Sequence, residues 1–484
     1  MTQGHATADT ANVVFTKLYD FNPNDFASGY NPNGRLIADI AGNLYGVALY
    51  GGHAPKDNPL GGGVVYSLGR AAGGGYHYHV LHVFQGGPTD GARPVGGLTM
   101  DGAGDLYGTT AAGGSGWTGT VFKLTPASAA AAADITILYD FTAVSKSGIN
   151  ADGAAPNSSL LIDIHGTLFG TTSSGGANGG GTVFSLTRQT DGTYSFAKLH
   201  DFAAPQGYDD TTGGLVRDGS GNLYGLKAAG GAYGSGEIFG LFLSGGSYSY
   251  QSLYSFPQID YTRALPFGSL AIDAAGVLYG TTNEGGEDLS GTVFSYPGGS
   301  SPATPTTLHR FNDVTGPSAP DAGVTIDAAG TLFGTASYSA TGNGAVYRLT
   351  PNGDGSYTYA TLFEFTEFKR QGDAPESPLL LDRVGHLFGT TVEGGADLGG
   401  VVFRIGETAE AIAVMEAGVV LQVIVTRPGR GYSTPPTVSI TPPANGMTAQ
   451  AVATVDHGSV TAVTVTNPGS GYDFGPQVGF TPPG

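Results

Sequence analysis

The chain has 484 residues, no cysteine, and 39 acidic against 20 basic side chains, so its formal net charge is −19. This charge repels phosphate backbones and predicts no nucleic-acid partner, and the lack of cysteine excludes disulfides and thiolate chemistry. No apolar run approaches the roughly 20 residues that a membrane helix needs, so we predict no membrane insertion.

The chain opens with a polar tail over residues 1–12, which lacks the basic and apolar regions of a signal peptide. A first strand is expected near residues 15–21, where Leu-Tyr-Asp-Phe combines β-forming side chains. The same pattern of Leu, an aromatic or His, any residue and Phe occurs six more times. These segments begin at Leu18, Leu81, Leu138, Leu199, Leu253, Leu308 and Leu362.

Three further segments recur in every repeat. An apolar strand ends in Asp, with Gly three residues later; a strand with Leu-aromatic-Gly follows; and a glycine-rich loop leads to a last strand such as Thr120–Leu124. Because every repeat carries the Asp, we interpret it as a turn cap and not as a catalytic group. These residues are Asp39, Asp101, Asp163, Asp218, Asp273, Asp327 and Asp382.

Each repeat therefore holds four short strands, here named a (ending in Asp), b (Leu-aromatic-Gly), c (after the glycine-rich loop) and d (Leu-aromatic-x-Phe). Recurring four-stranded units are typical of a β-propeller. The chain begins with a lone d strand and its last repeat ends with c. We predict an all-β fold with a seven-bladed β-propeller over residues 13–406, closed by the N-terminal strand. A straight solenoid is the alternative.

The repeats resemble the tandem GloVer repeats of bacterial secreted or surface proteins. The shared features are the Leu-Tyr-x-Phe strand, the Asp-x-x-Gly-x-Leu-Tyr-Gly-Thr-Thr segment and the Gly-Gly…Gly-Thr-Val-Phe segment, and they cover residues 13–406. The resemblance implies an exported propeller and no catalytic residue set. The expected localisation is therefore extracellular or on the cell surface, with the leader absent from this chain.

After residue 406 the pattern changes. Residues 411–432 and 451–472 match at an offset of 40, and both end in Pro-Gly-x-Gly-Tyr. Alternating Val, Ile and Thr before each Pro-Gly predicts strand, turn and strand. We expect two 40-residue β repeats to form a small domain over residues 407–484. Such repeats resemble those of phage virion and bacterial surface proteins, which implies attachment or self-assembly through this tail.

The loops that join d to a and b to c share one face of the predicted propeller. The d–a loops are long and varied, which makes this face the predicted ligand site. In the b–c loops, the position four residues after Leu-aromatic-Gly is Glu or Tyr in four neighbouring repeats and small elsewhere. Aromatic faces stack on sugar rings. The predicted ligand-binding residues are Tyr50, Glu284, Tyr338, Glu393 and the single tryptophan, Trp117, which offers a stacking platform or a wedge between blades.

Asp288 and Asp397 follow in the two acidic loops and are candidate Ca²⁺ ligands, because calcium prefers carboxylate oxygens. No other cofactor is expected.

No nucleophile, zinc or phosphate-loop motif is present in the sequence. We therefore expect a binding or adhesion protein that recognises a polysaccharide or cell-surface glycan, and not an enzyme. Two alternatives stay open: a carbohydrate-active hydrolase or lyase that uses Glu284 or Glu393, and a structural subunit of an extracellular assembly or virion.

Overall fold

The computed structural model describes residues 12–52, 60–71, 75–126, 133–203, 213–258, 264–286, 289–314, 316–340, 342–472 and 475–484. The chain divides into two compact units. The first, here called the C-terminal unit, comprises residues 1–18, 381–388 and 403–484, and the second, the repeat unit, comprises residues 19–380 and 389–402. Residues 1–11 of the predicted tail lie outside the described residues, and the predicted boundary at 406 and 407 stays a prediction.

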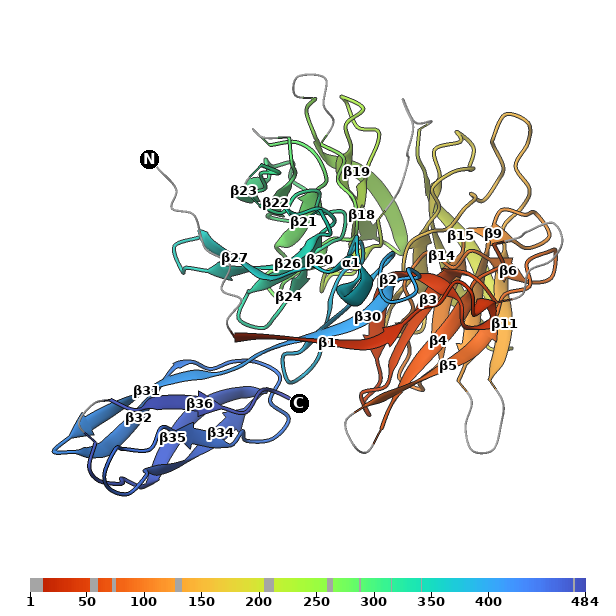
Figure 1. Ribbon diagram of the computed structural model, residues 1–484. Coiled ribbons are helices and arrows are strands. Elements are labelled where there is room, and N and C mark those ends of the chain that lie inside the picture. Colours follow the sequence, from red (N-terminus) through yellow and green to blue (C-terminus); the bar gives the residue numbers. More distant parts are fainter. Residues whose placement is uncertain are drawn as a thin grey trace. The chain divides into compact units, whose positions relative to one another are not determined.

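The described residues form seven four-stranded sheets in which neighbouring strands are antiparallel wherever their pairing is given. The first sheet contains β2 (Tyr30–Ala38), β3 (Leu44–Tyr50), β4 (Val64–Arg70) and β5 (Tyr76–Val83), in that order (Figure 1). The second contains β7 (Thr99–Met100), β8 (Leu106–Thr110), β10 (Thr120–Thr125) and β11 (Asp134–Asp140). The third contains β12 (Leu161–Ile162), β13 (Leu168–Thr171), β14 (Thr182–Arg188) and β15 (Tyr194–Asp201).

The next three sheets repeat the same order. The fourth contains β16 (Val216–Arg217), β17 (Leu223–Lys227), β18 (Glu237–Ser244) and β19 (Ser247–Ser255). The fifth contains β20 (Ala271–Ile272), β21 (Leu278–Thr282), β22 (Thr292–Tyr296) and β23 (Thr306–Arg310). The sixth contains β24 (Thr325–Ile326), β25 (Leu332–Ala336), β26 (Ala345–Pro351) and β27 (Tyr357–Glu364).

The seventh sheet differs in where its strands come from in the chain. Its order is β1 (Val13–Asp20), β30 (Val401–Glu407), β29 (Leu387–Thr391) and β28 (Leu380–Leu381). Smaller elements complete the repeats: a 3-10 helix η2 (Phe26–Ser28), the short helix α1 (Phe368–Gln371), and a two-stranded sheet of β6 (Gly91–Ala92) and β9 (Ala112–Gly113). The predictions of an all-β fold and of four-stranded sheets are confirmed. Within the described ranges, no helix has the length and apolarity to cross a membrane.

The glycine of Leu-aromatic-Gly makes room for an aromatic ring on strand c. A Cβ built on Gly170 would lie 2.6 Å from Cζ of Phe184, which is closer than real Cβ atoms come. The same contact recurs at the glycines of the first six repeats. The ring fills this space completely, since Phe184 has an exposed fraction of 0%. The glycine of the motif therefore lets strand b pair with strand c at a position where strand c carries a large aromatic side chain.

The repeated Asp closes the turn between strands a and b. Asp163 Oδ1 accepts hydrogen bonds from the backbone N–H groups of His165 and Thr167, both at 2.9 Å. All seven repeats show this pair of bonds. In four repeats a tyrosine hydroxyl also donates to Oδ2 of the Asp. The prediction that these aspartates are structural turn caps is confirmed.

Aromatic rings connect neighbouring sheets. In each repeated contact, the Phe that ends strand d packs edge-on against the aromatic ring on strand c of the next sheet, a favourable geometry for aromatic pairs. The centroid distances are 5.3 Å for Phe21–Tyr66, 5.2 Å for Phe84–Phe122, 5.3 Å for Phe141–Phe184, 5.1 Å for Phe202–Phe239, 5.5 Å for Phe256–Phe294 and 5.1 Å for Phe311–Tyr347. The hydrophobic core of the repeat unit therefore contains the same kind of aromatic contact at each of these junctions between neighbouring sheets.

Two of these strand c rings are tyrosines, and their hydroxyl groups are buried. Neither Tyr66 nor Tyr347 has a hydrogen-bond partner for this oxygen among the described residues. Burial raises the pKa of both hydroxyls above the ordinary value, so both stay neutral. The other repeats carry Phe at this position.

We expect Tyr347→Phe to raise the free energy of unfolding by about 1 kcal/mol, because it removes a buried polar group that has no partner. Urea unfolding followed by circular dichroism measures the change. Tyr359→Phe is the control, since the Tyr359 hydroxyl is bonded to Thr361 Oγ1 at 3.1 Å. A loss of stability in Tyr347→Phe equal to that of the control would contradict the expectation.

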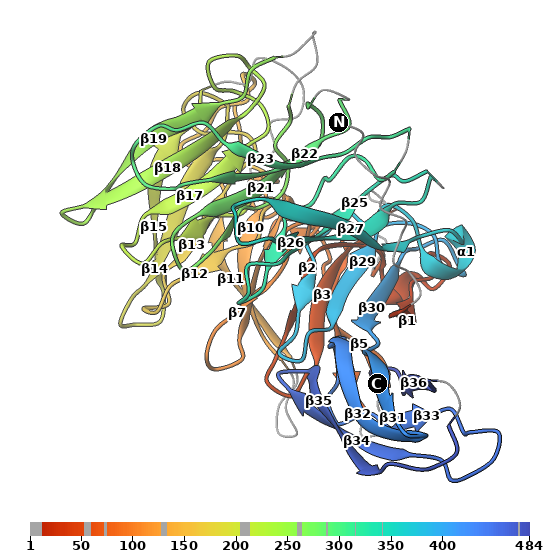
Figure 2. The ribbon, with the colours of Figure 1, turned by 90° about the vertical axis from the view of Figure 1, so that its left-hand side faces the viewer.

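The C-terminal unit contains one six-stranded sheet, with the order β33 (Val438–Ile440), β36 (Gln477–Phe480), β31 (Glu410–Glu416), β32 (Val419–Arg427), β35 (Ser459–Asn467) and β34 (Gln450–Asp456) (Figure 2). Its two halves repeat the same contacts. The backbone N–H of Ala409 donates to the Tyr432 hydroxyl, and that of Ala449 to the Tyr472 hydroxyl, each at 2.8 Å. Both tyrosines belong to the buried core of this sheet.

Candidate binding cavity

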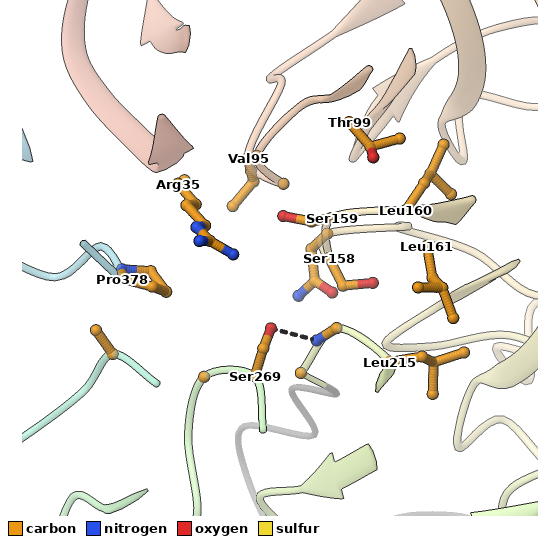
Figure 3. A pocket seen from close by; sticks show the side chains of 18 of the residues that line it. Arg35, Val95, Thr99, Ser158, Ser159, Leu160, Leu161, Leu215, Ser269 and Pro378 are labelled. Carbon is orange, nitrogen blue, oxygen red and sulfur yellow. Dashed lines mark hydrogen bonds between the residues drawn. The ribbon is translucent and has the colours of Figure 1, made fainter. Parts of the chain in front are cut away.

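A cavity of about 730 Å³ lies in the repeat unit (Figure 3). Every repeat contributes to its wall with residues of strand a or of the segment directly before it. The lining residues fall within segments 33–37, 95–99, 157–162, 213–216, 267–270, 321–325 and 376–378. Because the d–a loops lead into these segments, the cavity wall begins where the long, varied loops of the repeats end.

Small residues allow the seven segments to approach one another. A Cβ on Gly97 would lie 2.7 Å from the backbone nitrogen of Arg35, and a Cβ on Gly34 would lie 2.5 Å from that of Gly97. Ser269 Oγ, which lines the cavity, accepts a hydrogen bond of 2.9 Å from the backbone N–H of Gly214 in the preceding repeat (Figure 3). The wall is therefore formed mainly by backbone and short side chains.

Three ionisable side chains line this cavity, and they come from three repeats. Arg35 belongs to the first repeat, Asp321 to the sixth and Glu376 to the seventh. The rest of the lining is glycine, serine, asparagine, threonine or apolar. The ionisable groups of the cavity thus come from the first repeat and the last two repeats of the chain.

Arg35 directs its guanidinium group into the cavity (Figure 3). Its side chain is exposed there, yet the surrounding protein removes much of the bulk water, and this desolvation lowers its pKa below the ordinary value. No hydrogen bond or ion pair joins its side chain to any residue that the structure describes. The group is therefore a cation without a protein counter-ion among the described residues.

The two carboxyl groups have a different environment. Asn283 Nδ2 and Ser337 Oγ donate hydrogen bonds to Asp321, but burial has the larger effect and raises the pKa of Asp321. Burial also raises the pKa of Glu376 to about 7, and the charges of Asp321, Glu393 and Asp373 add to the shift. Glu376 therefore changes its charge near neutral pH.

This shift predicts a pH-dependent contribution to stability. The pKa of Glu376 is about 7 in the folded protein against 4.5 for the ordinary group, so folding favours the protonated acid. Its contribution is fully present below about pH 4.5 and is lost as the pH rises through about 7. We expect Glu376→Gln to leave the melting temperature nearly unchanged at about pH 5 and to raise it relative to wild type at about pH 8.

Differential scanning calorimetry across this range measures the effect. Glu367→Gln is the control, because Glu367 is an exposed residue that pairs with Arg370 at 3.2 Å and does not line the cavity. A difference between Glu376→Gln and wild type that stays constant with pH would contradict the assignment.

The structure places four of the predicted ligand-binding residues at one register position. Tyr50 pairs with Tyr30, the first residue of β2. Tyr338 and Glu393 pair with Ser318 and Asp373, which precede strand a of their repeats. The backbone N–H of Glu284 bonds to the carbonyl oxygen of Ala264 at 3.2 Å in the same way.

The predicted residues do not contact one another. In the described part of the chain, no hydrogen bond, ion pair or ring contact joins any two of Tyr50, Trp117, Glu284, Tyr338 and Glu393. Glu393 is close enough to Glu376 for its charge to raise the pKa of that cavity residue. The role of the five residues in ligand binding stays a prediction.

Trp117 lies in the loop before β10 and has an exposed fraction of 66%, so it does not act as a wedge between sheets. Its φ of 58° falls in the left-handed region that glycine favours. Gly179 and Gly234 have such angles in the loops of the third and fourth repeats. An exposed tryptophan held at a position of this kind keeps the stacking hypothesis open.

The predicted calcium site stays untested. Asp288 lies outside the described residues, and Asp397 is exposed. Among the residues that the structure describes, no group of three or more His, Asp or Glu side chains is arranged to hold a metal ion.

Sequence reasoning missed the three ionisable cavity residues, although the aligned repeats carry a signal for them. The position four residues before the turn Asp is Gly, Ser or Pro in six repeats and Arg35 in the first. The position six residues before it is acidic in the last two repeats, at Asp321 and Glu376. Such departures from the repeat pattern on strand a or directly before it, and not those in the b–c loops, mark the cavity.

The sheets and the cavity define an all-β tandem-repeat protein whose seven repeats all line one cavity. The model of the Gloeobacter/Verrucomicrobia repeat matches residues 6–149, 61–294 and 250–417. These matches cover most of the chain, and the protein belongs to this repeat family. The predicted resemblance to GloVer repeats is confirmed, and membership fits a surface or binding protein in general terms.

No curated protein sequence matches the chain. Among solved structures, virginiamycin B lyase from Staphylococcus aureus is similar, with 12% identity, a TM-score of 0.48, and coverage of 81% of this chain and 98% of that one. The extracellular domain of a putative one-component system from B. thetaiotaomicron has 10% identity and a TM-score of 0.47, with coverage of 94% and 48%. Similarity at this level carries no argument about ligand or activity.

Proposed function

We propose that this protein is an extracellular or surface binding protein that holds part of a glycan in the cavity lined by all seven repeats. The observation that carries the proposal is the cavity itself. Its volume of about 730 Å³ suits a small ligand, its wall combines glycine and polar residues with apolar ones, and its ionisable groups lie in three of the seven repeats. Binding residues are commonly positioned by a rigid scaffold, and the sheets of the repeats provide such a scaffold for the ionisable residues of the cavity.

The proposal includes a closed seven-bladed β-propeller, in which the first, sixth and seventh repeats are neighbours. Two contacts within the repeat unit support closure by the N-terminal strand. The backbone N–H of Phe21, directly after β1, donates to Gly400 O at 3.0 Å, and the Phe21 ring packs on Tyr66 of the first sheet. Thr335 Oγ1 donates to Ser377 O at 3.3 Å, which connects the sixth and seventh repeats. In such a ring Arg35, Asp321 and Glu376 belong to one arc.

The residues of this arc suit the hydroxyl groups of a sugar. Carboxylates of Asp321 and Glu376 accept hydrogen bonds from hydroxyls. Elsewhere on the wall, in the third repeat, Ser159 supplies a hydroxyl group. Tyr338, with an exposed fraction of 60%, offers an aromatic face for a sugar ring that extends beyond the cavity. These features favour a glycan over an apolar ligand.

The test is a glycan array probed with the full chain, followed by calorimetric titration of the glycans that bind. Glu376→Gln and Asp321→Asn are expected to weaken binding about tenfold or more, because each removes a charged hydrogen-bond acceptor. Asp354→Asn, on the exposed turn between β26 and β27, is the control and should leave binding unchanged. Absence of glycan binding, or equal binding by all three variants, would contradict the proposal.

A second candidate, a carbohydrate-active hydrolase or lyase, is favoured by one observation. The pKa of about 7 lets Glu376 donate a proton near neutral pH, and Asp321 is a second carboxyl group in the same wall. Release of reducing ends from polysaccharides that wild type binds, and its loss in Glu376→Gln, would establish this activity. Binding without turnover would leave the binding function alone.

The C-terminal unit serves attachment or self-assembly in this proposal. Its sheet exposes Ile412, Leu421 and Val452 to exposed fractions of 55%, 60% and 55%. Exposed apolar residues on one sheet are typical of surfaces that meet a partner. Analytical ultracentrifugation of the full chain tests self-assembly, and a monomer at every concentration would contradict it.

A further inference from the structure

We infer that the cavity recognises a glycan that carries a carboxylate, such as a uronic acid unit, and that Arg35 is the residue that binds this carboxylate. The inference rests on the proposed function, and it adds the chemical class of the ligand. It depends on the state of one side chain, which the following observations describe.

Arg35 is a charged side chain in a partly desolvated environment, where a protein usually provides a counter-ion. The chain holds 39 acidic residues against 20 basic ones, so acidic partners are plentiful. Nevertheless, its guanidinium forms no ion pair with a described residue, although it points into the cavity (Figure 3). Removing a charge from bulk water is costly unless an opposite charge compensates it. An anion from the ligand would supply this compensation.

The two carboxyl groups of the wall are occupied in other ways. Asp321 accepts hydrogen bonds from Asn283 and Ser337, and the neighbours whose charges act on Glu376 are all acidic. Desolvation is the one cause that lowers the pKa of the Arg35 guanidinium, and no neighbouring charge contributes to this shift. Arg35 and the acidic pair therefore offer two separate subsites, one for an anion and one for hydrogen-bond donors.

A uronic acid unit matches both subsites. Its carboxylate is planar and fits the fork of an arginine through two parallel hydrogen bonds. Its ring hydroxyls can donate to Asp321 and Glu376. A phosphate or sulfate group would bring more negative charge toward these two acids, so a singly charged carboxylate is favoured. The cavity wall also contains Asn157, whose buried Oδ1 has no hydrogen-bond partner among the described residues and could accept a further hydroxyl after a small rearrangement.

The test compares each acidic oligosaccharide with its own neutral form. Oligomers of galacturonate, glucuronate and mannuronate, and the same oligomers after reduction of the carboxyl groups, are titrated into the full chain by calorimetry. We expect wild type to bind at least one acidic oligomer about tenfold to hundredfold more tightly than its reduced form, as one charge-assisted pair provides. Arg35→Gln should remove this preference, and Arg35→Lys should keep part of it because the charge remains without the fork.

Arg188→Gln is the matched control, since Arg188 is exposed at the end of β14 and does not line the cavity. Circular dichroism and melting of each variant show that it is folded. The inference is overturned if acidic and reduced oligomers bind equally, or if Arg35→Gln keeps the preference. Binding of neutral glycans that depends on Glu376 would then leave the proposed function standing, whereas absence of binding to every glycan would remove both.

Discussion

Replacing Phe184 by alanine should lower the free energy of unfolding of the repeat unit by about 3–5 kcal/mol. The ring is fully buried on β14 and contacts Phe141 of the neighbouring sheet at a centroid distance of 5.3 Å. It also stacks on Phe196 at 5.8 Å. Alanine would leave a cavity that neither neighbouring sheet can fill, because the backbone of both is fixed by strand pairing.

The same site predicts a coupling with the glycine opposite. Gly170→Ala should cost about 1–3 kcal/mol, since its Cβ would lie 2.6 Å from Phe184 Cζ. In Gly170→Ala/Phe184→Leu the smaller side chain leaves room for the new methyl group, so the double variant should be more stable than the sum of the single changes predicts. Gly102→Ala, at a turn with no atom within 4 Å of the added Cβ, is the control. Additive effects in urea unfolding would contradict this account of the motif.

Phe21→Ala should destabilise the repeat unit as much as the same change at Phe141, by about 3–5 kcal/mol in both variants. Both rings are fully buried, and each packs edge-on against a strand c aromatic of the next sheet, at 5.3 Å in both cases. The two positions differ in the chain, because Phe21 follows the N-terminal strand and Phe141 ends an internal repeat. If the ring closes through the N-terminal strand, this difference has no energetic consequence.

Urea unfolding of both variants by circular dichroism, which does not depend on the exposed Trp117, provides the comparison. Val144→Ala is a control with an apolar residue that has an exposed fraction of 40% and should change stability little. A cost for Phe21→Ala below about 1 kcal/mol, with the full cost retained at Phe141, would show that the N-terminal strand is not part of the cooperative structure.

The repeat made most of the fold predictable from the sequence. Seven copies of a pattern allow each position to be judged against six others, so the repeats alone identify the turn aspartates and the four strands of each unit. The reason for Leu-aromatic-Gly could not be predicted in the same way. Gly170 and Phe184 are opposite each other on neighbouring strands of one sheet, and a sequence does not state which ring lies over which glycine.

The candidate site was less accessible to this reasoning. The b–c loops were the predicted site because Glu284 and Glu393 stand at a position where three other repeats carry a small residue. Of these two residues, only Glu393 has a charge that raises the pKa of a cavity residue, Glu376. The important departures are Arg35, inside β2, and Glu376, before β28. Both belong to segments that are otherwise apolar or small in the other repeats, so the repeat pattern did not mark them as a site. Their convergence depends on how seven distant segments meet, which is a property of the tertiary structure.

The central claim is that the cavity lined by all seven repeats is the binding site. A crystal structure of the full chain with a bound uronic acid oligosaccharide tests this claim most directly. The account predicts ligand density in the cavity, with a carboxylate about 2.7–2.9 Å from the guanidinium nitrogens of Arg35 and ring hydroxyls next to Asp321 and Glu376. Ligand bound only outside the cavity, for example on Trp117 or Tyr338, with the cavity filled by water, would contradict it.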